Sequence, residues 1–343
     1  MARSTVYNKI ANEESAERIL PENKQLSSDF LDYLKSIDRS KTTIEQYRND
    51  LRIFFVWNLE ANCNKRFTDI TKRDFARFQS NALENWQWSS SRIRRVKSVL
   101  SSLSNYVENI LDEEAEYAGY RSVIKKIESP VKTTVREKTV FNPEEVEALL
   151  SHLIEEEKYM QACVVALAAY SGRRKSELPR FKVSYFTEDN VIFGSLYKTN
   201  EPVQTKGRGS KGKMLYLYVL KKPFDPYLKL WMDERERLNI ESEWLFPDPN
   251  DPTKQLRTEI MDGWIDSYSK FLGKDFYFHA LRHYFTTQLL KQNIPADVVK
   301  EIVGWESIDM VSVYNDRSID ESIGMYFDEN GIRKVDTGDL GSL

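Results

Sequence analysis

The sequence predicts a mainly α-helical protein of two domains, the second of which also contains a small antiparallel β hairpin or sheet. Three observations lead to this fold class. Apolar residues recur at helical spacing through most of the chain, a polar stretch at 129–140 lacks an apolar face, and two β-rich segments flank a turn rich in Gly and Lys. A length of 343 residues suits two domains, and 41% hydrophobic with 30% charged residues is typical of a globular protein.

The N-terminal part predicts a polar tail at 1–21 and an all-helical domain at 22–128. The tail has little periodicity, whereas helical spacing of apolar residues begins at Leu26. Further helices are expected where a hydroxyl residue precedes an acidic one by three positions, because this spacing forms a capping box. Two pairs with this spacing precede a helical pattern of apolar residues, Thr42 with Glu45 and Thr71 with Asp74.

A basic helix is predicted after Ser89, with an apolar run through Leu100 and Leu103 in its second half. For an isolated run of charges, a solvated helix face is the more common interpretation. The four cations of its first half are Arg92, Arg94, Arg95 and Lys97.

The stretch at 129–140 predicts an extended linker, which contains Lys132 and Arg136. The second domain, 141–316, begins with Asn142 as an N-cap and Pro143 at the first helical position. The segment 161–170 is apolar on all sides, which predicts a buried helix. Segments 191–197 and 214–220 predict one hairpin, helices return at 226–238, and a tail at 317–343 has an amphipathic pattern over 319–327.

Composition limits the classes of function. No apolar run approaches the roughly 20 residues of a membrane span, and the N-terminus lacks the apolar core of a secretory signal. Cys63 and Cys163 are isolated, so neither a disulfide framework nor a metal site is indicated, and a reducing cytoplasmic location fits best. The net charge is −3, but residues 198–222 carry six Lys and one Arg against one Glu, which permits binding to nucleic acid.

The stretch from Phe276 to Asp316 contains the pattern with the clearest chemistry. His279, Arg282 and His283 stand at positions i, i+3 and i+4, so a helix places them on one face. Arg offers planar bidentate donors and His exchanges a proton near neutral pH, so this face suits a phosphate group. Trp305 follows Gly304, and Tyr314 comes nine residues after Trp305.

This order resembles the C-terminal boxes of the tyrosine recombinase, or phage integrase, family, which has His-x-x-Arg, then His or Trp, and then a nucleophilic Tyr nine residues later. The segment SGRRKSEL resembles the first arginine box of the family. The resemblance implies that Arg174 is catalytic, that Glu177 holds it in place, and that Arg173, where the family usually has an apolar residue, is a surface charge or a DNA contact. The catalytic lysine of the family lies on the hairpin turn, where Lys206 matches best and Lys211, Lys213 and Lys198 are alternatives.

The resemblance implies a core-binding domain at 22–128 and a catalytic domain at 141–316 of a site-specific DNA recombinase. Tyr314 would form a 3′-phosphotyrosine, Arg174 and Arg282 would neutralise the phosphate, and Lys206 would protonate the leaving 5′ oxygen. His279 and Trp305 would assist near the tyrosine, with His283 as an orienting group. No cofactor and no metal is expected, because the phosphotyrosine conserves the bond energy and the sequence contains no phosphate-binding loop.

The partner that this resemblance implies is double-stranded DNA, bound by a homo-tetramer, with an accessory directionality factor as a further partner. Integration or excision of a mobile element is the expected use. The tail could dock on a neighbouring protomer or on its own domain. A type IB topoisomerase and a catalytically inactive DNA-binding regulator are the alternatives. Ahead of such a catalytic domain, the basic helix is interpreted as a DNA contact, and the expected DNA-binding residues are Arg92, Arg94, Arg95, Lys97, Lys132, Arg136, Arg173, Lys211 and Lys213.

Overall fold

The computed structural model describes residues 10–131, 139–207, 209, 211–305, 307, 327–328 and 331–332. The chain divides into two compact units, the first made of Met1–Glu137 with Gly207–Lys211 and the second of Lys138–Lys206 with Gly212–Leu343. Each unit has its own buried apolar cluster. The described part of the chain is mainly helical with small antiparallel sheets, which confirms the predicted fold class.

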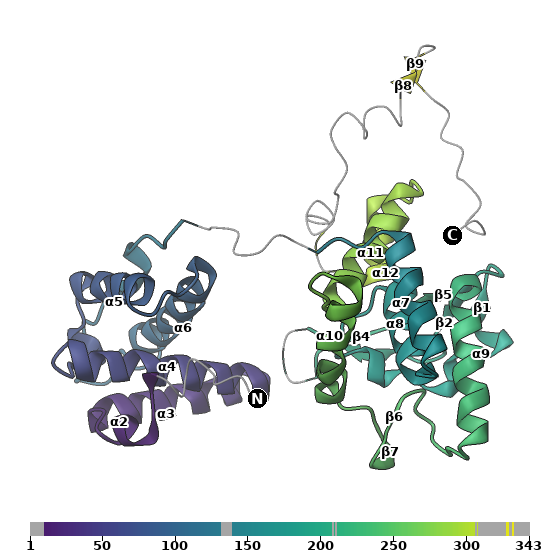
Figure 1. The fold of residues 1–343 in the computed structure, drawn as a ribbon. Helices are drawn as coiled ribbons and strands as arrows, with labels where there is room; N and C mark the ends of the chain where they lie inside the picture. Colours follow the sequence, from purple (N-terminus) through teal and green to yellow (C-terminus); the bar gives the residue numbers. More distant parts are fainter. Residues whose placement is uncertain are drawn as a thin grey trace. The chain divides into compact units, whose positions relative to one another are not determined.

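The described residues of the first unit form helices and short 3₁₀ turns around one core (Figure 1). Phe54, Phe75 and Phe78 lie at its centre with their rings edge-on or tilted to one another, as aromatic side chains prefer in a packed core. The elements are α2 (Glu13–Glu17), α3 (Pro21–Ser36), α4 (Lys41–Ala61), η1 (Phe67–Asp69), α5 (Lys72–Glu84), α6 (Ser90–Asn109) and η2 (Ile124–Lys126).

The caps of α4 and α5 test the two capping boxes expected from sequence. Thr71 and Asp74 form the reciprocal box that begins α5. Thr42 does not begin α4, because the helix starts two residues earlier and the side chain of Ser40 accepts the hydrogen bond from the Thr43 amide. The serine two residues upstream of Thr42 therefore supplies the cap.

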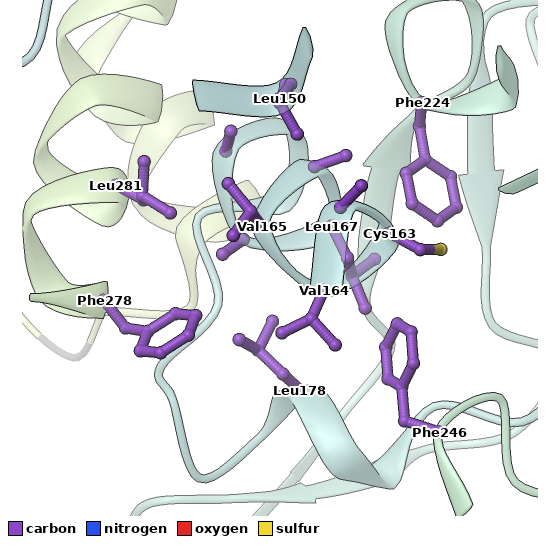
Figure 2. Packing of buried hydrophobic residues seen from close by; sticks show 14 of the residues in the cluster. Leu150, Cys163, Val164, Val165, Leu167, Leu178, Phe224, Phe246, Phe278 and Leu281 are labelled. Atoms are coloured by element: carbon purple, nitrogen blue, oxygen red, sulfur yellow. The ribbon is translucent and has the colours of Figure 1, made fainter. Parts of the chain in front are cut away.

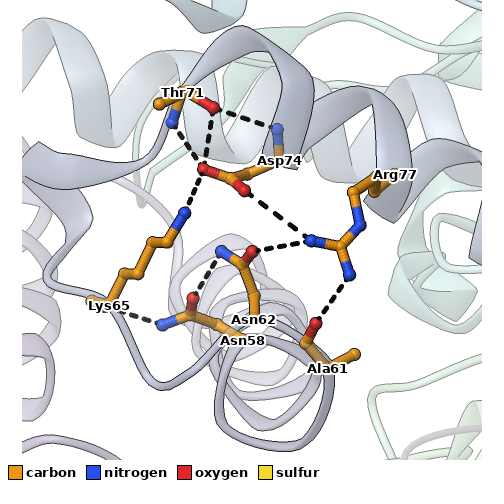
Figure 3. A network of polar contacts seen from close by, with 7 residues as sticks. All are labelled: Asn58, Ala61, Asn62, Lys65, Thr71, Asp74 and Arg77. Atoms are coloured by element: carbon orange, nitrogen blue, oxygen red, sulfur yellow. Dashed lines mark hydrogen bonds and ion pairs between the residues drawn. The ribbon is translucent and has the colours of Figure 1, made fainter.

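A polar network closes the junction between α4 and α5 (Figure 3). The Lys65 ammonium lies 2.8 Å from a carboxylate oxygen of Asp74, and Arg77 donates to the Ala61 carbonyl. Asn58 donates to the carbonyl of Lys65 at 2.7 Å, and Asn62 donates to the side chain of Asn58. The network satisfies the Ala61 carbonyl at the end of α4, which the helix itself leaves unpaired.

The second unit is built around the buried helix α8 (Tyr159–Ser171), which confirms the helix expected at 161–170. Every residue from Ala162 to Ala169 is buried, and Figure 2 shows Val164, Val165 and Leu167 pointing into the surrounding apolar side chains. Helices α7 (Pro143–Glu155), α9 (Lys221–Arg237) and α11 (Phe278–Lys291) pack against α8, and α7 starts at the predicted Asn142 cap. The remaining helices of the unit that the structure describes are η3 (Leu178–Arg180), η4 (Val183–Tyr185), η5 (Glu188–Asn190), α10 (Thr258–Leu272) and α12 (Ala296–Val303).

The β structure is more divided than the single hairpin expected from sequence. Strands β1 (Val191–Ile192), β2 (Leu196–Lys198) and β5 (Tyr218–Leu220) form one antiparallel sheet in the order β1-β2-β5. Strands β3 (Val203–Thr205) and β4 (Lys213–Leu215) form a separate hairpin with Thr205 opposite Lys213. The division arises at Thr199, which exchanges hydrogen bonds with Leu217 and so separates β4 from β5.

Three further differences concern elements away from this hairpin. Helix α9 begins at Lys221 rather than at Pro226, since the Lys221 amide donates to the Ser195 carbonyl and the early amides of a helix need no intrahelical partner. Strands β6 (Pro247–Asp248) and β7 (Asp251–Gln255) form a hairpin that the sequence did not indicate. Strands β8 (Phe327–Asp328) and β9 (Gly331–Ile332) pair within the tail expected at 317–343, and all but the last residue of the amphipathic segment 319–327 lies outside the described residues.

Candidate active site

Helix α11 carries the His-x-x-Arg pattern on one face, as its spacing predicted. Arg282 is 0% exposed, and the imidazole of His283 is buried beside that of His279 with ring centroids 5.3 Å apart, nearly perpendicular. One guanidinium N–H of Arg282 donates to the carbonyl oxygen of Gly172 at 2.8 Å. This bond joins α11 to the end of α8, 110 residues earlier in the chain.

The first arginine box forms a turn directly after α8. Gly172 ends the helix in the left-handed conformation, with φ 60°, which glycine adopts without steric cost. Arg174 follows and donates from its guanidinium to the carboxylate of Glu177 at 3.0 Å, while its backbone amide donates to the other carboxylate oxygen at 3.1 Å. Glu177 thus fixes both the backbone and the side chain of Arg174.

Glu177 also holds Lys206, which follows strand β3. The backbone amide of Lys206 donates to the Glu177 carboxylate at 3.2 Å. Burial by itself raises the pKa of the Glu177 carboxyl, but the charges of Arg173 and Arg174 and the hydrogen bonds from Arg174 outweigh it and lower this pKa below its ordinary value of 4.5. Glu177 is therefore ionised at neutral pH, and one buried carboxylate positions both an arginine and the lysine turn.

The lysine alternatives occupy different places. The ammonium of Lys198, on β2, lies 4.7 Å from the ring centroid of Tyr216, and Lys213 is exposed on β4 opposite Thr205. Lys211 lies in the turn between β3 and β4 and is also exposed. The Lys206 side chain is exposed and close enough to His279 to affect its pKa. Among these four, Lys206 is the one that the Glu177 contact connects to the arginine box, and its catalytic role stays a prediction.

His279 lies among three positive charges. Its pKa falls below the ordinary 6.5, first because neighbouring side chains shield the imidazole from water and then because of the charges of Arg282, Arg174 and Lys206. The imidazole is therefore neutral at pH 7 and able to accept a proton. The residue nevertheless keeps an exposed edge, so a substrate can reach it.

Trp305 lies at the end of α12, where Gly304 has the left-handed conformation with φ 76°. The amides of Gly304 and Trp305 both donate to the Lys300 carbonyl, at 2.8 and 3.0 Å. The Trp305 indole is 4% exposed, and the centre of the Arg282 guanidinium lies 5.5 Å from its ring centroid. The indole thus packs against the arginine of the His-x-x-Arg pattern.

One expectation is wrong. Arg173 was expected on the surface as a free charge or a DNA contact, but its side chain is 1% exposed. Its guanidinium donates to the carbonyls of Ser171 and Ile302. The Arg173 side chain points into the interior, as an apolar side chain at this position would. Its guanidinium reaches backbone carbonyls instead of solvent. A signal was present in the sequence, because Arg173 directly follows the Gly that ends an all-apolar helix.

The basic half of α6 is engaged with its own unit. The guanidiniums of Arg92 and Arg95 both pair with Asp50, which is 1% exposed, while Arg94 donates to the Pro130 carbonyl and Lys97 to the Ile127 carbonyl. These four cations are therefore more than a solvated helix face, because each contacts its own unit. DNA contact by these side chains stays a prediction. Tyr314, Lys132 and Arg136 lie outside the described residues.

Two features of the described ranges bear on other classes of protein. Within those ranges, no three His, Cys, Asp or Glu side chains gather in a way that could hold a metal ion. None of the described helices combines the length and the apolarity needed to cross a membrane.

Comparisons with known proteins agree with this geometry. Residues 139–321 match the model of the phage integrase family. The chain is 30% identical to the SPbeta prophage-derived recombinase-like protein YomM of Bacillus subtilis over 80% of either chain, and 24% identical to a tyrosine recombinase of Thermosipho africanus over 83% of this chain and 92% of that one. The Tn1549 transposon integrase, solved in complex with transposon right end DNA, has the same fold with a TM-score of 0.64 at 15% identity, over 87% of this chain and 97% of that one. The protein therefore belongs to the phage integrase family of site-specific tyrosine recombinases.

Proposed function

We propose that this recombinase cuts DNA by attack of Tyr314 on a phosphodiester and rejoins the strands by the reverse reaction. The observation that carries the proposal is the contact set of Glu177, whose carboxylate binds Arg174 and the Lys206 amide beside Arg282 and His279. Three cations, Arg282, Arg174 and Lys206, are thus close enough to the neutral His279 imidazole to act on its pKa. A phosphodiester is the substrate that this combination suits, because it is anionic and becomes more so during attack.

Each group has a distinct part in the reaction. Arg174 and Arg282 stabilise the charge that develops on the non-bridging oxygens. The phenol of Tyr314 loses its proton to His279, its oxygen bonds to phosphorus, and the bond from phosphorus to the 5′ oxygen breaks. Lys206 supplies the proton that converts this leaving oxygen to a hydroxyl. The phosphotyrosine conserves the energy of the broken bond, so the rejoining step is the same displacement run backward.

Trp305 and His283 support the reacting groups in this proposal. The Trp305 indole packs against Arg282 and restricts the directions in which its guanidinium can move. The His283 imidazole meets that of His279 edge-on and limits its rotation. Both contacts orient a neighbour instead of touching the phosphate directly.

The proposed partners and biological use follow from the proposed cleavage and rejoining of DNA. We infer that the chain binds double-stranded DNA and acts as a homo-tetramer on two duplexes, with an accessory factor that sets direction. The prophage-derived relative and the transposon integrase support movement of a mobile element as the use. A reducing cytoplasm suits the exposed free thiol of Cys63 and the buried free thiol of Cys163.

The test is a search for a covalent protein–DNA adduct. The full chain is incubated with a library of nicked duplexes made from the source genome, in which the nick traps the cleaved strand. Complexes that survive denaturation are collected and their DNA is sequenced. Adducts enriched at one site in the wild type and absent in Tyr314→Phe are the expected result, and sequencing the trapped strand defines the cleavage position.

Other outcomes assign the protein to the alternatives. Adducts spread over many sequences, together with relaxation of supercoiled plasmid, would indicate a type IB topoisomerase. Tight binding at one site without any adduct would indicate a DNA-binding regulator. An adduct that persists in Tyr314→Phe would show that a different residue is the nucleophile.

A further inference from the structure

The buried Arg173 has contacts that the proposed reaction does not use. Its Nε donates to the Ser171 carbonyl at 3.2 Å, and one terminal nitrogen donates to the Ile302 carbonyl, 129 residues later in the chain. Burial lowers the pKa of this guanidinium to about 10, so the side chain is still charged at neutral pH. A charge in such a place is costly unless it is partnered, and here two of its N–H groups donate to these carbonyls while the negative charge of Glu177 also stabilises it.

The Ile302 carbonyl belongs to the last turn of α12. The carbonyls of a last turn lack intrahelical partners, and a positive charge there interacts favourably with the helix dipole. Close packing surrounds the same point, because a Cβ placed on Gly304 would lie 3.5 Å from an Arg173 nitrogen and 3.0 Å from Leu215. Arg173 thus caps the helix that leads directly into Trp305.

The other end of the Arg173 contact lies in the arginine box. Ser171 precedes Gly172, whose carbonyl accepts from Arg282, and Arg174 follows. Arg282 in turn packs against the Trp305 ring. Arg173 therefore joins the arginine box to the end of α12. Trp305, which follows α12, packs against Arg282, and Arg282 binds the box through the Gly172 carbonyl.

We propose that Arg173 is a positioning residue that fixes the end of α12, and with it Trp305, relative to Arg174 and Arg282. The inference rests on the proposed function for its catalytic consequence. Its structural part, the placement of Trp305, stands independently of any reaction. An apolar residue of similar size could fill the same space, but it would leave the box and α12 joined by packing alone.

The test compares Arg173→Met, Arg173→Lys and the wild type. Methionine keeps an unbranched apolar stem in place of the arginine stem and removes the donors, so Trp305 should be less well placed while the unit still folds. Lysine keeps the charge but cannot bridge both carbonyls, so an intermediate effect is expected. Arg235→Met is the matched control, because Arg235 is also buried and donates only to backbone carbonyls, those of Ser242, Trp244 and Leu245.

The first readout is the position of Trp305. The full chain, which has seven tryptophans, is labelled with 5-fluorotryptophan, and Trp305→Phe identifies the fluorine resonance of Trp305. Arg173→Met should shift or broaden that resonance, Arg173→Lys should do so less, and Arg235→Met should leave it in place. Thermal unfolding of each variant shows how much stability is lost in each case.

The second readout is the single-turnover cleavage rate at saturating DNA. Misplacement near a reacting group can cost about 100-fold in rate, so a loss of about 10- to 100-fold is expected for Arg173→Met, with partial recovery in Arg173→Lys. Arg235→Met should cleave at the wild-type rate below its unfolding temperature.

The outcomes separate this proposal from the previous one. If Arg173→Met and Arg235→Met give the same Trp305 resonance and the same cleavage rate, the positioning role is wrong. If Arg173→Met does not fold, an Arg173→Lys protein identical to wild type in both readouts overturns it equally. If the wild type forms no adduct at all, the proposed function fails, and the Trp305 resonance still decides the role of Arg173.

Discussion

The His279 imidazole is neutral at pH 7 and lies near three cations. Its protonation should therefore change the rate of DNA cleavage. Protonation would place a fourth positive charge beside Arg282, Arg174 and Lys206 and would remove the proton acceptor. The rate of adduct formation at subsaturating DNA should therefore fall as the pH drops, with a midpoint below the ordinary 6.5. Adduct yield against pH measures this midpoint.

His279→Gln is the control for that titration. It should cleave about 100-fold more slowly, and the acidic fall should disappear, because glutamine has no proton to gain in this range. A midpoint above 6.5, or an acidic fall unchanged in His279→Gln, would assign the titration to another group.

Glu177→Gln should weaken both the fold and the reaction. Removing one partner of a buried ion pair costs about 3 kcal/mol in the free energy of unfolding, and Arg174 and Lys206 would lose their common anchor. The folded-state pKa of Glu177 is lowered, so its contribution is complete above 4.5 and is lost as the pH falls through the folded value. Urea unfolding at pH 7 and at pH 4 should show the difference between wild type and variant shrinking at the lower pH.

Glu234→Gln is the matched control on α9. Glu234 pairs with the exposed Arg237, and a surface pair contributes less than about 1 kcal/mol. Equal losses in the two variants would mean that the Glu177 contacts stabilise no more than a surface pair does.

At the level of single residues, the sequence predicted what local spacing determines. His279, Arg282 and His283 share a face because the helix repeat places them there. The burial of Arg173 was not predicted, since it depends on a carbonyl more than a hundred positions away. The second contact of Glu177, to the Lys206 amide, was missed for the same reason.

Among the elements, the turn after α8 depends on Gly172 for two separable reasons. A side chain there would be strained at φ +60°, and its Cβ would lie 2.4 Å from Cδ1 of Phe285. Gly273 ends α10 at φ +65° with nothing within 4 Å of the same position. Gly273→Ala should therefore cost about 1–2 kcal/mol from backbone strain alone.

Gly172→Ala should cost about 1–3 kcal/mol more than Gly273→Ala, because Phe285 must move. It should also slow cleavage, since the turn carries Arg174 and its carbonyl binds Arg282. Chemical denaturation and adduct rates measured in parallel give both quantities. Equal destabilisation by the two substitutions would rule out the contribution from Phe285.

The cations of α6 should separate into structural and DNA-facing groups. Arg95→Ala deprives the buried Asp50 of its bidentate partner and should cost about 2 kcal/mol. Arg94→Ala removes only an exposed contact to a carbonyl and should change stability by less than about 0.5 kcal/mol. If α6 lies on DNA, Arg94→Ala lowers affinity and reduces the salt slope by about one, and an unchanged slope would exclude that contact.

The boundaries of elements were less predictable than their existence. The start of α4 was misplaced because two hydroxyl residues near it could each cap the helix, and Ser40 does so. The start of α9 was misplaced because Pro226 stands within the helix, after a first turn whose amides bond elsewhere. The sheet was divided by Thr199, a contact that periodicity does not encode.

Over the whole molecule, the buried apolar clusters divide between the two units, which predicts two independent folding units. Fragments 10–131 and 139–343 should each unfold in one cooperative transition, because each contains its own buried cluster. The full chain should bind DNA about 100-fold more tightly than either fragment, since the linker raises the effective concentration of the second contact. Calorimetry and binding titrations test the two statements.

A fragment 139–343 that binds DNA as tightly as the full chain would show that the first unit contributes no contact. A fragment that does not fold would show that the apolar cluster of the second unit is insufficient alone. The match to the phage integrase family, over 139–321, begins at the same residue as this fragment.

The burial of α8 has a consequence for how the second unit fluctuates. A helix covered on all sides opens only when its neighbours have left, so its amide protons belong to the slowest hydrogen-exchange class of the unit. Arg174 lies three residues beyond its last turn, whereas Lys206 and Trp305 follow a three-residue strand and an eight-residue helix. Local openings would therefore release the lysine turn and the end of α12 first, and the arginine box would be the fixed point to which both return.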